Sequence, residues 1–238
     1  MNYKNLTERT IKLLDVTSLN SHDTNESIET LCKKALSLPY PVAAMCVYPQ
    51  FLPLVKTVLG SESSIGLATV VNFPEGKLAT KETCLEIKDA INKGVTEIDV
   101  VFPYHAFLRD QLQEVRDFMS EVRKASLGKI VKVILETGAY PDDKAIYEAT
   151  HLCIETGCNF VKTSTGKIPK GATLEAARTM LYAIYDSHGS CGLKISGGIR
   201  TLDDVANYFA LADDIMGKEW ISPATFRIGA SSLIDTLA

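Results

Sequence analysis

Two lysines stand where buried β-strands are expected. Lys162 lies in "FVKTSTGK" (160–167) and Lys194 lies in "GLKISGGIR" (192–200), and each has an apolar residue before it and a serine two places after it. A free lysine has a pKa of about 10.4, so about one molecule in 2,500 is neutral at pH 7. Burial and a neighbouring positive charge both favour the neutral amine, which can attack a carbonyl carbon. The pair is therefore a candidate site for Schiff-base chemistry.

Further charged side chains recur on the strand faces that are expected to point inward. Asp99 lies in "EIDVVF", and we predict that it moves protons while a carbinolamine and an imine form. Asp15, Lys132 and Glu136 occupy similar positions. Charge in a protein interior is costly unless it is paired, so a buried ion-pair network without chemistry is the alternative interpretation. The convergence of six charged residues from several strands favours a functional site.

Three loops that follow consecutive predicted strands are typical of a phosphate site. They read "STGK" (164–167), "SGGIR" (196–200) and "GASSL" (229–233). Barrel enzymes commonly hold a phosphate in such loops through backbone N–H groups. A plain turn is the alternative for each loop taken alone. The predicted binding groups are the backbone of Gly197 and Gly198, the hydroxyl and N–H groups of Ser231 and Ser232, and the ammonium group of Lys167.

These residues are distributed over a regular alternation of short apolar runs and longer amphipathic segments. Strands are expected at 13–19, 42–48, 65–73, 97–102, 130–137, 160–164, 193–197 and 226–231. Helices are expected at 23–38, 49–60, 80–94, 109–128, 141–157, 173–189 and 201–217, with an extra helix at 1–12 and a short tail at 232–238. Helix ends are expected near Gly94, Gly128, Gly157, Gly189 and Gly217.

Eight βα units of roughly 30 residues each predict an α/β fold. The favoured architecture is one domain over residues 1–238, a closed (β/α)8 TIM barrel with an extra N-terminal helix. An open, doubly wound sheet is the competing fold. The first helix after the first strand should begin at Asp23 or Thr24, because both side chains can cap a helix.

The composition narrows the class of protein. The net charge is -4 and the pI is about 5.6, which argues against a general nucleic-acid-binding surface. No apolar run approaches the length of a membrane span, and the N-terminus has no apolar signal region. The six cysteines form no CxxC pair and the four histidines have no metal spacing, which predicts a cytoplasmic protein with reduced thiols and no metal site. A homodimer is left open, because no exposed apolar pattern identifies an interface.

The motifs taken together resemble those of the deoxyribose-phosphate aldolases. In order they are "LLDVTSLN", "AAMCVYP", "ATVVNFPEG", "EIDVVFPY", "KVILETG", "FVKTSTGK", "LKISGGIRT" and "RIGASSL", and they cover nearly the whole chain. The resemblance implies that Lys162 forms the Schiff base, and that Lys194 and Asp99 act as proton donor and acceptor. It also implies that the substrate phosphate binds at Gly166, Lys167, Gly197, Gly198, Ser231 and Ser232. The predicted substrate-binding set further includes Asp15, Thr17, Cys46 and Thr165, although the apolar flanks of Cys46 favour a packing role.

Two features depart from the family pattern. The chain reads "KISGG" where many relatives read Lys-Pro-Ala-Gly-Gly, so Ser196 either adds a hydroxyl near the phosphate or packs. Some relatives have a longer tail that ends in tyrosine, whereas the last tyrosine here is Tyr208. Without a tail-assisted proton transfer, we expect slower turnover or a proton that is carried by water.

The resulting prediction is a class I aldolase that reversibly cleaves 2-deoxy-D-ribose 5-phosphate to D-glyceraldehyde 3-phosphate and acetaldehyde. Its partners are then small phosphosugars and aldehydes. The lysine itself supplies the electron sink, so no metal or organic cofactor is expected. Two alternatives remain open. One is a phosphosugar isomerase with Glu136 or Asp99 as its base, and the other is a non-catalytic barrel that binds a sugar phosphate.

Overall fold

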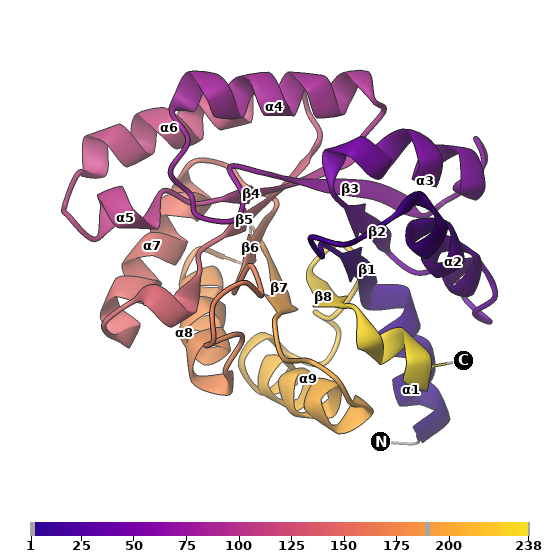
Figure 1. The fold of residues 1–238 in the computed structure, drawn as a ribbon. Coiled ribbons are helices and arrows are strands. Elements are labelled where there is room, and N and C mark those ends of the chain that lie inside the picture. The colour runs from indigo at the N-terminus through magenta and orange to yellow at the C-terminus, as the bar shows by residue number, and fades with distance from the viewer. Residues whose placement is uncertain (1–2, 189–190, 238) are drawn as a thin grey trace.

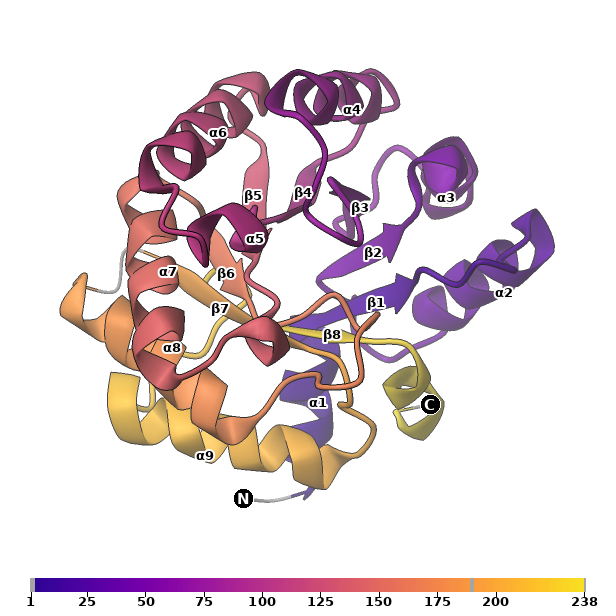
Figure 2. The ribbon, with the colours of Figure 1, turned by 60° about the vertical axis from the view of Figure 1, so that its left-hand side comes forward.

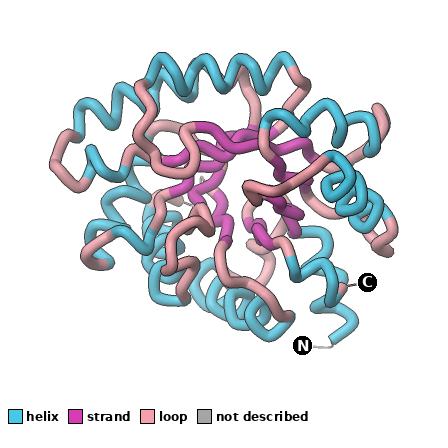
Figure 3. Tube along the Cα trace, in the orientation of Figure 1, coloured by secondary structure: helices cyan, strands magenta, loops and turns pink. Residues whose placement is uncertain are grey.

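The strands of the protein close into a barrel. The computed structural model describes residues 3–188 and 191–237. Eight parallel strands follow one another around the barrel in chain order, and β1 pairs with both β2 and β8. Helices surround these strands (Figures 1 and 3). The predicted TIM barrel is confirmed, and an open sheet is excluded because the first and last strands are hydrogen-bonded.

Short strands alternate with longer helices, as a βα repeat requires. The strands are β1 (Leu14–Ser18), β2 (Ala44–Val47), β3 (Gly66–Val71), β4 (Glu97–Val101), β5 (Ile130–Ile134), β6 (Phe160–Lys162), β7 (Gly192–Ser196) and β8 (Phe226–Ala230). The helices are α1 (Tyr3–Leu13), α2 (Asn25–Leu36), α3 (Leu52–Leu59), α4 (Thr80–Asn92), α5 (Tyr104–Phe107), α6 (Leu112–Ala125), α7 (Asp143–Glu155), α8 (Leu174–Asp186) and α9 (Leu202–Met216). Single 3-10 turns are η1 (Pro49–Phe51), η2 (Thr137–Ala139) and η3 (Ser232–Thr236).

Local side-chain chemistry sets the helix ends. Thr24 and Thr201 each accept a hydrogen bond from the backbone N–H three residues further on. Such caps satisfy donors that the first turn of a helix leaves unpaired. Glycines with positive φ lie at the expected helix ends Gly94, Gly128, Gly157 and Gly217, whereas Gly189 lies outside the described residues.

The two faces of each strand meet different environments. Side chains that alternate outward, among them Val16, Ile98 and Val161, pack with the helices in the main hydrophobic core. Side chains that alternate inward divide the barrel interior into two parts. On β2 and β3 they are small and apolar, and Cys46 packs beside Ala68 there. The charged inward side chains come from the other strands, β1 and β4 to β8.

Some elements differ from the expected ranges. β5 ends at Ile134, and Glu136 beyond it has a φ of 62°, which turns the chain out of the sheet. The prediction that Glu136 lies in this strand is therefore wrong, although its side chain is buried. β6 is shorter than expected and ends at Lys162 itself. The sequence pattern did not predict α5, because four residues are too few to show a helical period.

The extra N-terminal helix is present and packs beside the last repeat. α1 contacts α9 and β8, and it buries Leu6, Ile11 and Leu13. Figure 2 shows α1 next to α9 at one side of the barrel. Within residues 3–188 and 191–237, no helix has both the length and the apolar character that are needed to cross a membrane.

Candidate active site

A cavity of about 200 Å³ lies at the carboxyl ends of β1, β6, β7 and β8. Active sites of TIM barrels lie at this end, because the βα loops converge there. The lining includes these predicted site residues: Thr17, Lys162, Thr165, Gly166, Lys167, Gly197, Gly198, Ser231 and Ser232. The structure thus brings the candidate nucleophile and all three predicted phosphate loops into one space.

Asp99 joins the two candidate catalytic lysines beneath this cavity. Its Oδ2 atom lies 2.8 Å from Lys162 Nζ and 2.8 Å from Lys194 Nζ. Its Oδ1 atom accepts a hydrogen bond of 2.9 Å from Lys132 Nζ. Lys162 and Lys194 are paired in register on adjacent strands, which lets both reach the same oxygen. The candidate nucleophile and the candidate proton carriers are therefore in direct contact.

Of the three lysines that contact Asp99, Lys162 is the one that lines the cavity. Its side chain is 2% exposed, whereas those of Lys132 and Lys194 are fully buried. Burial lowers the pKa of Lys162, Asp99 opposes this shift, and the charge of Lys194 adds to it. The net shift is downward, toward the neutral amine. Desolvation is the larger cause, and the neighbouring lysine that the sequence indicated is a smaller one.

Lys194 and Asp99 shift toward their charged forms instead. Burial by itself would lower the pKa of Lys194, but Asp15 and Asp99 outweigh it, and the pKa rises. Burial also opposes the ionised form of Asp99, yet Lys132, Lys162 and Lys194 hold the pKa of this carboxyl well below its usual value. Lys194 therefore stays protonated beside an ionised Asp99, while Lys162 is the group that is closest to losing its proton.

The charges of this buried network do not balance when every member is ionised. The described residues contribute four cations and three carboxylates, namely Lys132, Lys162, Lys194 and Arg227 with Asp15, Glu97 and Asp99. Among these pairs Lys162 contacts one carboxylate, whereas Lys132 contacts three. An unmatched charge is costly in a protein interior. Loss of the Lys162 proton leaves three cations and three carboxylates, so the network favours a neutral amine at the cavity.

The loops after β6 and β7 are tied together at the mouth of the cavity. The Gly197 carbonyl accepts a hydrogen bond of 2.9 Å from the Ala172 N–H, and a Cβ on Gly171 would lie only 2.5 Å from the same carbonyl oxygen. The Ser196 hydroxyl donates to the Ser164 carbonyl at 2.6 Å. Ser196 therefore links the two loops, and because it also lines the cavity, both roles that its sequence position allowed stay open.

The loop after β6 is held from both of its sides. Lys167 Nζ donates a hydrogen bond to the Leu19 carbonyl on the loop after β1, and both residues line the cavity. The Thr165 hydroxyl donates to the Glu136 carboxylate and accepts a hydrogen bond of 3.0 Å from the Lys167 N–H. Burial raises the pKa of Glu136, against the hydrogen bonds from Thr165. Glu136 thus orients this loop and does not line the cavity.

Two of the predicted substrate-binding residues lie beneath the cavity lining. Asp15 is fully buried, and its carboxylate pairs with Lys132, Lys194 and Arg227. Cys46 is also fully buried, in the apolar part of the barrel interior, and burial raises the pKa of its thiol. Asp15 is therefore a member of the charged network, and Cys46 has the packing environment that its flanks indicated.

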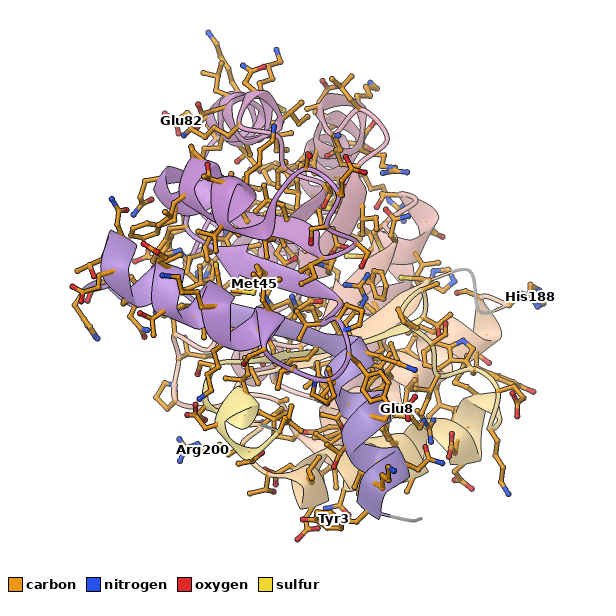
Figure 4. All side chains as sticks on the ribbon, turned by 90° about the vertical axis from the view of Figure 1, so that its right-hand side faces the viewer. Tyr3, Glu8, Met45, Glu82, His188 and Arg200 are labelled. Atoms are coloured by element: carbon orange, nitrogen blue, oxygen red, sulfur yellow. The ribbon has the colours of Figure 1, made fainter. Side chains whose placement is uncertain are left out.

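Sequence reasoning missed residues both at the mouth and beneath the site. Asn20 and Arg200 line the cavity, and Figure 4 shows Arg200 extending outward beside the C-terminal segment. The position of Arg200 directly after the paired glycines could have indicated it. Glu97 and Arg227 belong to the charged network. Because Glu97 lies two places before Asp99 in the same strand, the strand alternation could have found it.

Comparisons with known proteins agree with this arrangement. The sequence profile of the DeoC/LacD family aldolases matches residues 9–236. A provisionally named deoxyribose-phosphate aldolase from Coccidioides immitis is 29% identical, with a TM-score of 0.84, and the match covers 98% of this chain and 85% of that chain. A provisionally named deoxyribose-phosphate aldolase from Toxoplasma gondii ME49 has a TM-score of 0.90 at 24% identity, over 98% of this chain and 93% of that one.

A further solved structure is similar in fold. It is the deoxyribose phosphate aldolase from Aeropyrum pernix, whose tetrameric structure is described as unique, and it is 24% identical with a TM-score of 0.76 over 100% of this chain and 97% of that chain. At 24% identity, this likeness and the one to the Toxoplasma protein bear on the fold alone. The family profile spans nearly the whole chain and includes every element that carries the charged network. The chain therefore belongs to the DeoC/LacD aldolase family, a family of carbon–carbon lyases.

Proposed function

We propose that the protein is a class I deoxyribose-phosphate aldolase, which reversibly cleaves 2-deoxy-D-ribose 5-phosphate to D-glyceraldehyde 3-phosphate and acetaldehyde. The observation that carries the proposal is the environment of Lys162. Its buried amine has a lowered pKa and opens into the cavity, and Asp99 contacts it from below. A nucleophilic lysine for a carbonyl substrate needs both a neutral amine and an adjacent proton carrier.

Lys162 carries the covalent part of the proposed mechanism. Its neutral amine attacks the C1 aldehyde of the open-chain sugar, and the carbinolamine loses water to give a protonated imine. The C3 hydroxyl then loses its proton, the C2–C3 bond breaks, and its electron pair moves into the imine. Glyceraldehyde 3-phosphate leaves, and an enamine remains on the lysine. Protonation of the enamine at C2 and hydrolysis of the imine release acetaldehyde and restore the amine.

Asp99 and Lys194 carry the proton transfers. Asp99 Oδ2 contacts both Nζ atoms at 2.8 Å, so a proton can pass along this short path without large motions. Lys194 supplies a proton when the carbinolamine loses water, and the carboxylate of Asp99 stabilises the cations on either side. Positioned acid–base groups of this kind contribute roughly 10²–10⁴-fold to rates. Water completes the path at the cavity.

The loops at the mouth suit the phosphate end of the substrate. Lys167 and Arg200 bring two cations to the lining, and the paired glycines and serines of the loops after β7 and β8 lie beside them. Cationic side chains and glycine-rich turns are common phosphate ligands, because they combine charge with closely approaching N–H groups. The phosphate would then anchor the sugar while its aldehyde end reaches Lys162.

Borohydride trapping tests this proposal. Acetaldehyde and sodium borohydride should convert the imine into a stable ethyl amine, and peptide mass analysis should locate the ethyl group on Lys162. An isomerase that uses a carboxylate base, or a barrel that only binds a sugar phosphate, would form no such adduct. Absence of an adduct on Lys162 would overturn the proposed mechanism.

Lys167 provides a test of the substrate class. Lys167→Met should raise KM for 2-deoxyribose 5-phosphate by on the order of tenfold to a hundredfold, because a charge-assisted contact worth about 1.5–3 kcal/mol is removed. The KM for unphosphorylated 2-deoxyribose should change little, since that sugar has no phosphate to bind. Steady-state kinetics with both sugars measures the difference. Equal effects on the two sugars would place the phosphate elsewhere.

Gly229 on β8 makes room for the Lys194 side chain. A Cβ at this position would lie 2.8 Å from Ser196 Cβ and 3.0 Å from Lys194 Cε. Gly229→Ala is therefore expected to displace Lys194 from Asp99 and to lower kcat by about tenfold. Gly192→Ala is a useful comparison, because its Cβ would meet the Phe160 ring at 2.5 Å and should lower the thermal stability first. An unchanged kcat for Gly229→Ala would show that Lys194 tolerates the displacement.

A further inference from the structure

Two further charged side chains, Arg227 and Glu97, lie deeper in the barrel than Asp99 and Lys194 and do not line the cavity. Arg227 on β8 and Glu97 on β4 form a two-point pair, with Nη1–Oε2 and Nη2–Oε1 distances of 3.2 Å. They are 6% and 3% exposed, and the cavity lining includes neither. They border a different hollow, which also contains Lys12 and lies at the amino ends of the strands. Neither residue can therefore touch a substrate that is bound near Lys162.

Arg227 and Glu97 are connected to the site by two short routes. On one route, Arg227 Nη1 donates to Asp15 Oδ1 at 2.8 Å, and Asp15 Oδ2 accepts from Lys194 Nζ at 2.6 Å. On the other, Glu97 Oε2 lies 2.6 Å from Lys132 Nζ, which donates to Asp99 Oδ1 at 2.9 Å. Both routes end on groups that contact Lys162 or its carboxylate partner.

The surrounding chain holds this pair in one orientation. Arg227 Nε donates to the Pro223 carbonyl at 2.6 Å, and its guanidinium lies 5.4 Å from the centre of the Phe160 ring. On the other side, a Cβ on Gly66 would lie 2.7 Å from Glu97 Oε1, so this glycine leaves space for the carboxylate. A planar guanidinium with partners on every nitrogen cannot rotate without breaking several contacts.

The charge of Arg227 decides whether the buried network has more cations than carboxylates. With Arg227, the ion-paired groups of the described chain have four cations against three carboxylates, and a neutral Lys162 restores the balance. Without Arg227, the three lysines would match the three carboxylates, and a protonated Lys162 would be fully compensated. Charges in a buried network influence one another strongly, because little water screens them.

On the basis of the proposed aldolase function, we propose that Arg227 and Glu97 are positioning residues for the Lys162 nucleophile. The Arg227 cation makes Lys162 the surplus charge of the barrel interior, and Glu97 limits that surplus to one proton. The pair acts through Asp15 and Lys132, so it sets the protonation state of an amine that it does not touch.

The strands of the barrel differ in the charge that they bring near Lys162. β2 contributes the Cys46 thiol, and β3 contributes apolar side chains there. The ion-paired groups are Asp15 on β1, Glu97 and Asp99 on β4, Lys132 on β5, Lys194 on β7 and Arg227 on β8. Glu136 after β5, whose pKa is raised by burial, is outside these ion pairs, and Lys167 and Arg200 lie at the mouth. Arg227 and Glu97 form no ion pair with Lys162 or with Asp99, so changing them leaves both Lys162 and its carboxylate partner in place.

The test is the pH dependence with which acetaldehyde and borohydride label Lys162 in the folded protein. Arg227→Met should move the midpoint of labelling to higher pH, because the protonated amine is then better compensated. Glu97→Gln should move it to lower pH, because one carboxylate charge is lost. Each shift should be on the order of one pH unit. The double variant has three cations and two carboxylates, again a surplus of one, so its midpoint should return toward the wild-type value.

Controls separate this charge effect from a loss of structure. Arg227→Lys keeps the charge and should keep the wild-type midpoint. Lys170 is exposed and serves as an internal standard in the same digest. Its labelling should depend on pH in the same way in the wild type and in every variant. If Arg227→Met does not fold, the isosteric Glu97→Gln decides by the sign of its shift. Unchanged midpoints, or two single variants that shift in the same direction, would overturn the inference.

The same experiment distinguishes failure of the inference from failure of the proposed function. If wild-type Lys162 is labelled and cleaves the sugar phosphate, while the midpoints do not move, the inference alone is wrong. If Lys162 is labelled with the expected shifts but no cleavage occurs, the inference stands and the proposed substrate is wrong. If wild-type Lys162 is not labelled at all, both are overturned.

Discussion

Replacing Lys162 with methionine is expected to lower kcat/KM for cleavage of 2-deoxyribose 5-phosphate by on the order of 10⁴-fold or more. Methionine fills a similar volume but has no amine, so no imine can form and the C2–C3 bond has no electron sink. A coupled assay that detects glyceraldehyde 3-phosphate measures the loss. Borohydride trapping with acetaldehyde should also lose the labelled peptide.

The same substitution should leave the protein at least as stable as the wild type. Lys162 is the surplus cation of the buried network, and Asp99 keeps its contacts with Lys132 and Lys194 when Lys162 is removed. Removing one partner of a buried ion pair costs about 3–5 kcal/mol when it leaves a charge without a partner, and here Asp99 keeps two cations, so that cost does not arise. Urea unfolding measures the change. A clearly less stable variant would contradict the charge balance that the ion pairs indicate.

Lys170→Met is the matched control for this experiment. Lys170 lies on the loop that follows β6, eight positions after Lys162, and is exposed to solvent. The change from lysine to methionine is the same, but it should alter neither cleavage nor stability. Retention of cleavage by the Lys162 variant would leave a carboxylate-base mechanism as the better explanation of the site.

Replacing Asp99 with asparagine is expected to lower kcat by roughly 10²–10⁴-fold while still allowing Lys162 to be trapped. Asparagine preserves the shape of the side chain but cannot accept a proton at neutral pH. Asp99 raises the pKa of Lys162 in the wild type, against the effect of burial. Its loss should therefore lower the pKa of Lys162 further. Borohydride trapping of Lys162 should then persist to lower pH than in the wild type. Trapping without turnover would separate attack by the amine from the later proton transfers.

The Asp99 substitution should also destabilise the fold by about 3–5 kcal/mol, because it leaves buried cations without a carboxylate partner. The pKa of Asp99 is lowered in the folded protein, so its ionised form stabilises the fold above the unfolded-chain pKa of about 3.9. That stabilisation is lost as the pH falls below this value and through the folded-state pKa. The variant should lack this part of the acid sensitivity, which unfolding curves at pH 7 and at acidic pH can compare.

Asp15→Asn is the comparison for Asp99. Asp15 is as deeply buried and also pairs with Lys132 and Lys194, but it has no ion pair with Lys162. Its loss should destabilise the protein by a similar amount and reduce kcat less. Equal losses of kcat in the two variants would indicate that the whole network, and not the contact with Lys162, sets the rate.

Much of the fold followed from local patterns in the sequence. Strand alternation and helix caps such as Thr24 and Thr201 act over a few residues, so they can be recognised without a structure. The ends of the strands were less predictable. Glu136 leaves β5 because its backbone turns into the left-handed region, and its carboxylate then binds Thr165 on the next loop. Only the packed loop explains that turn.

The cavity, like the fold, was predictable from the sequence only in part. The order of the motifs predicted that the loops after β6, β7 and β8 would meet, because consecutive strands of a barrel are neighbours. It did not predict that the Ser196 hydroxyl would be engaged by the Ser164 carbonyl, or that Asp15 would lie beneath the lining. Those outcomes depend on side-chain directions and distances across the barrel.

The sequence by itself determined which chemical groups the barrel contains and the order in which its strands present them. Only the tertiary structure decided which of the buried lysines is uncompensated. Lys162 meets Asp99 across 63 positions of sequence, and Lys194 meets Asp15 across 179. The energy of a buried charge depends on its distance to each partner and on how much water is excluded. Those distances are set when β8 closes against β1, and they leave Lys162 as the surplus cation beside the cavity.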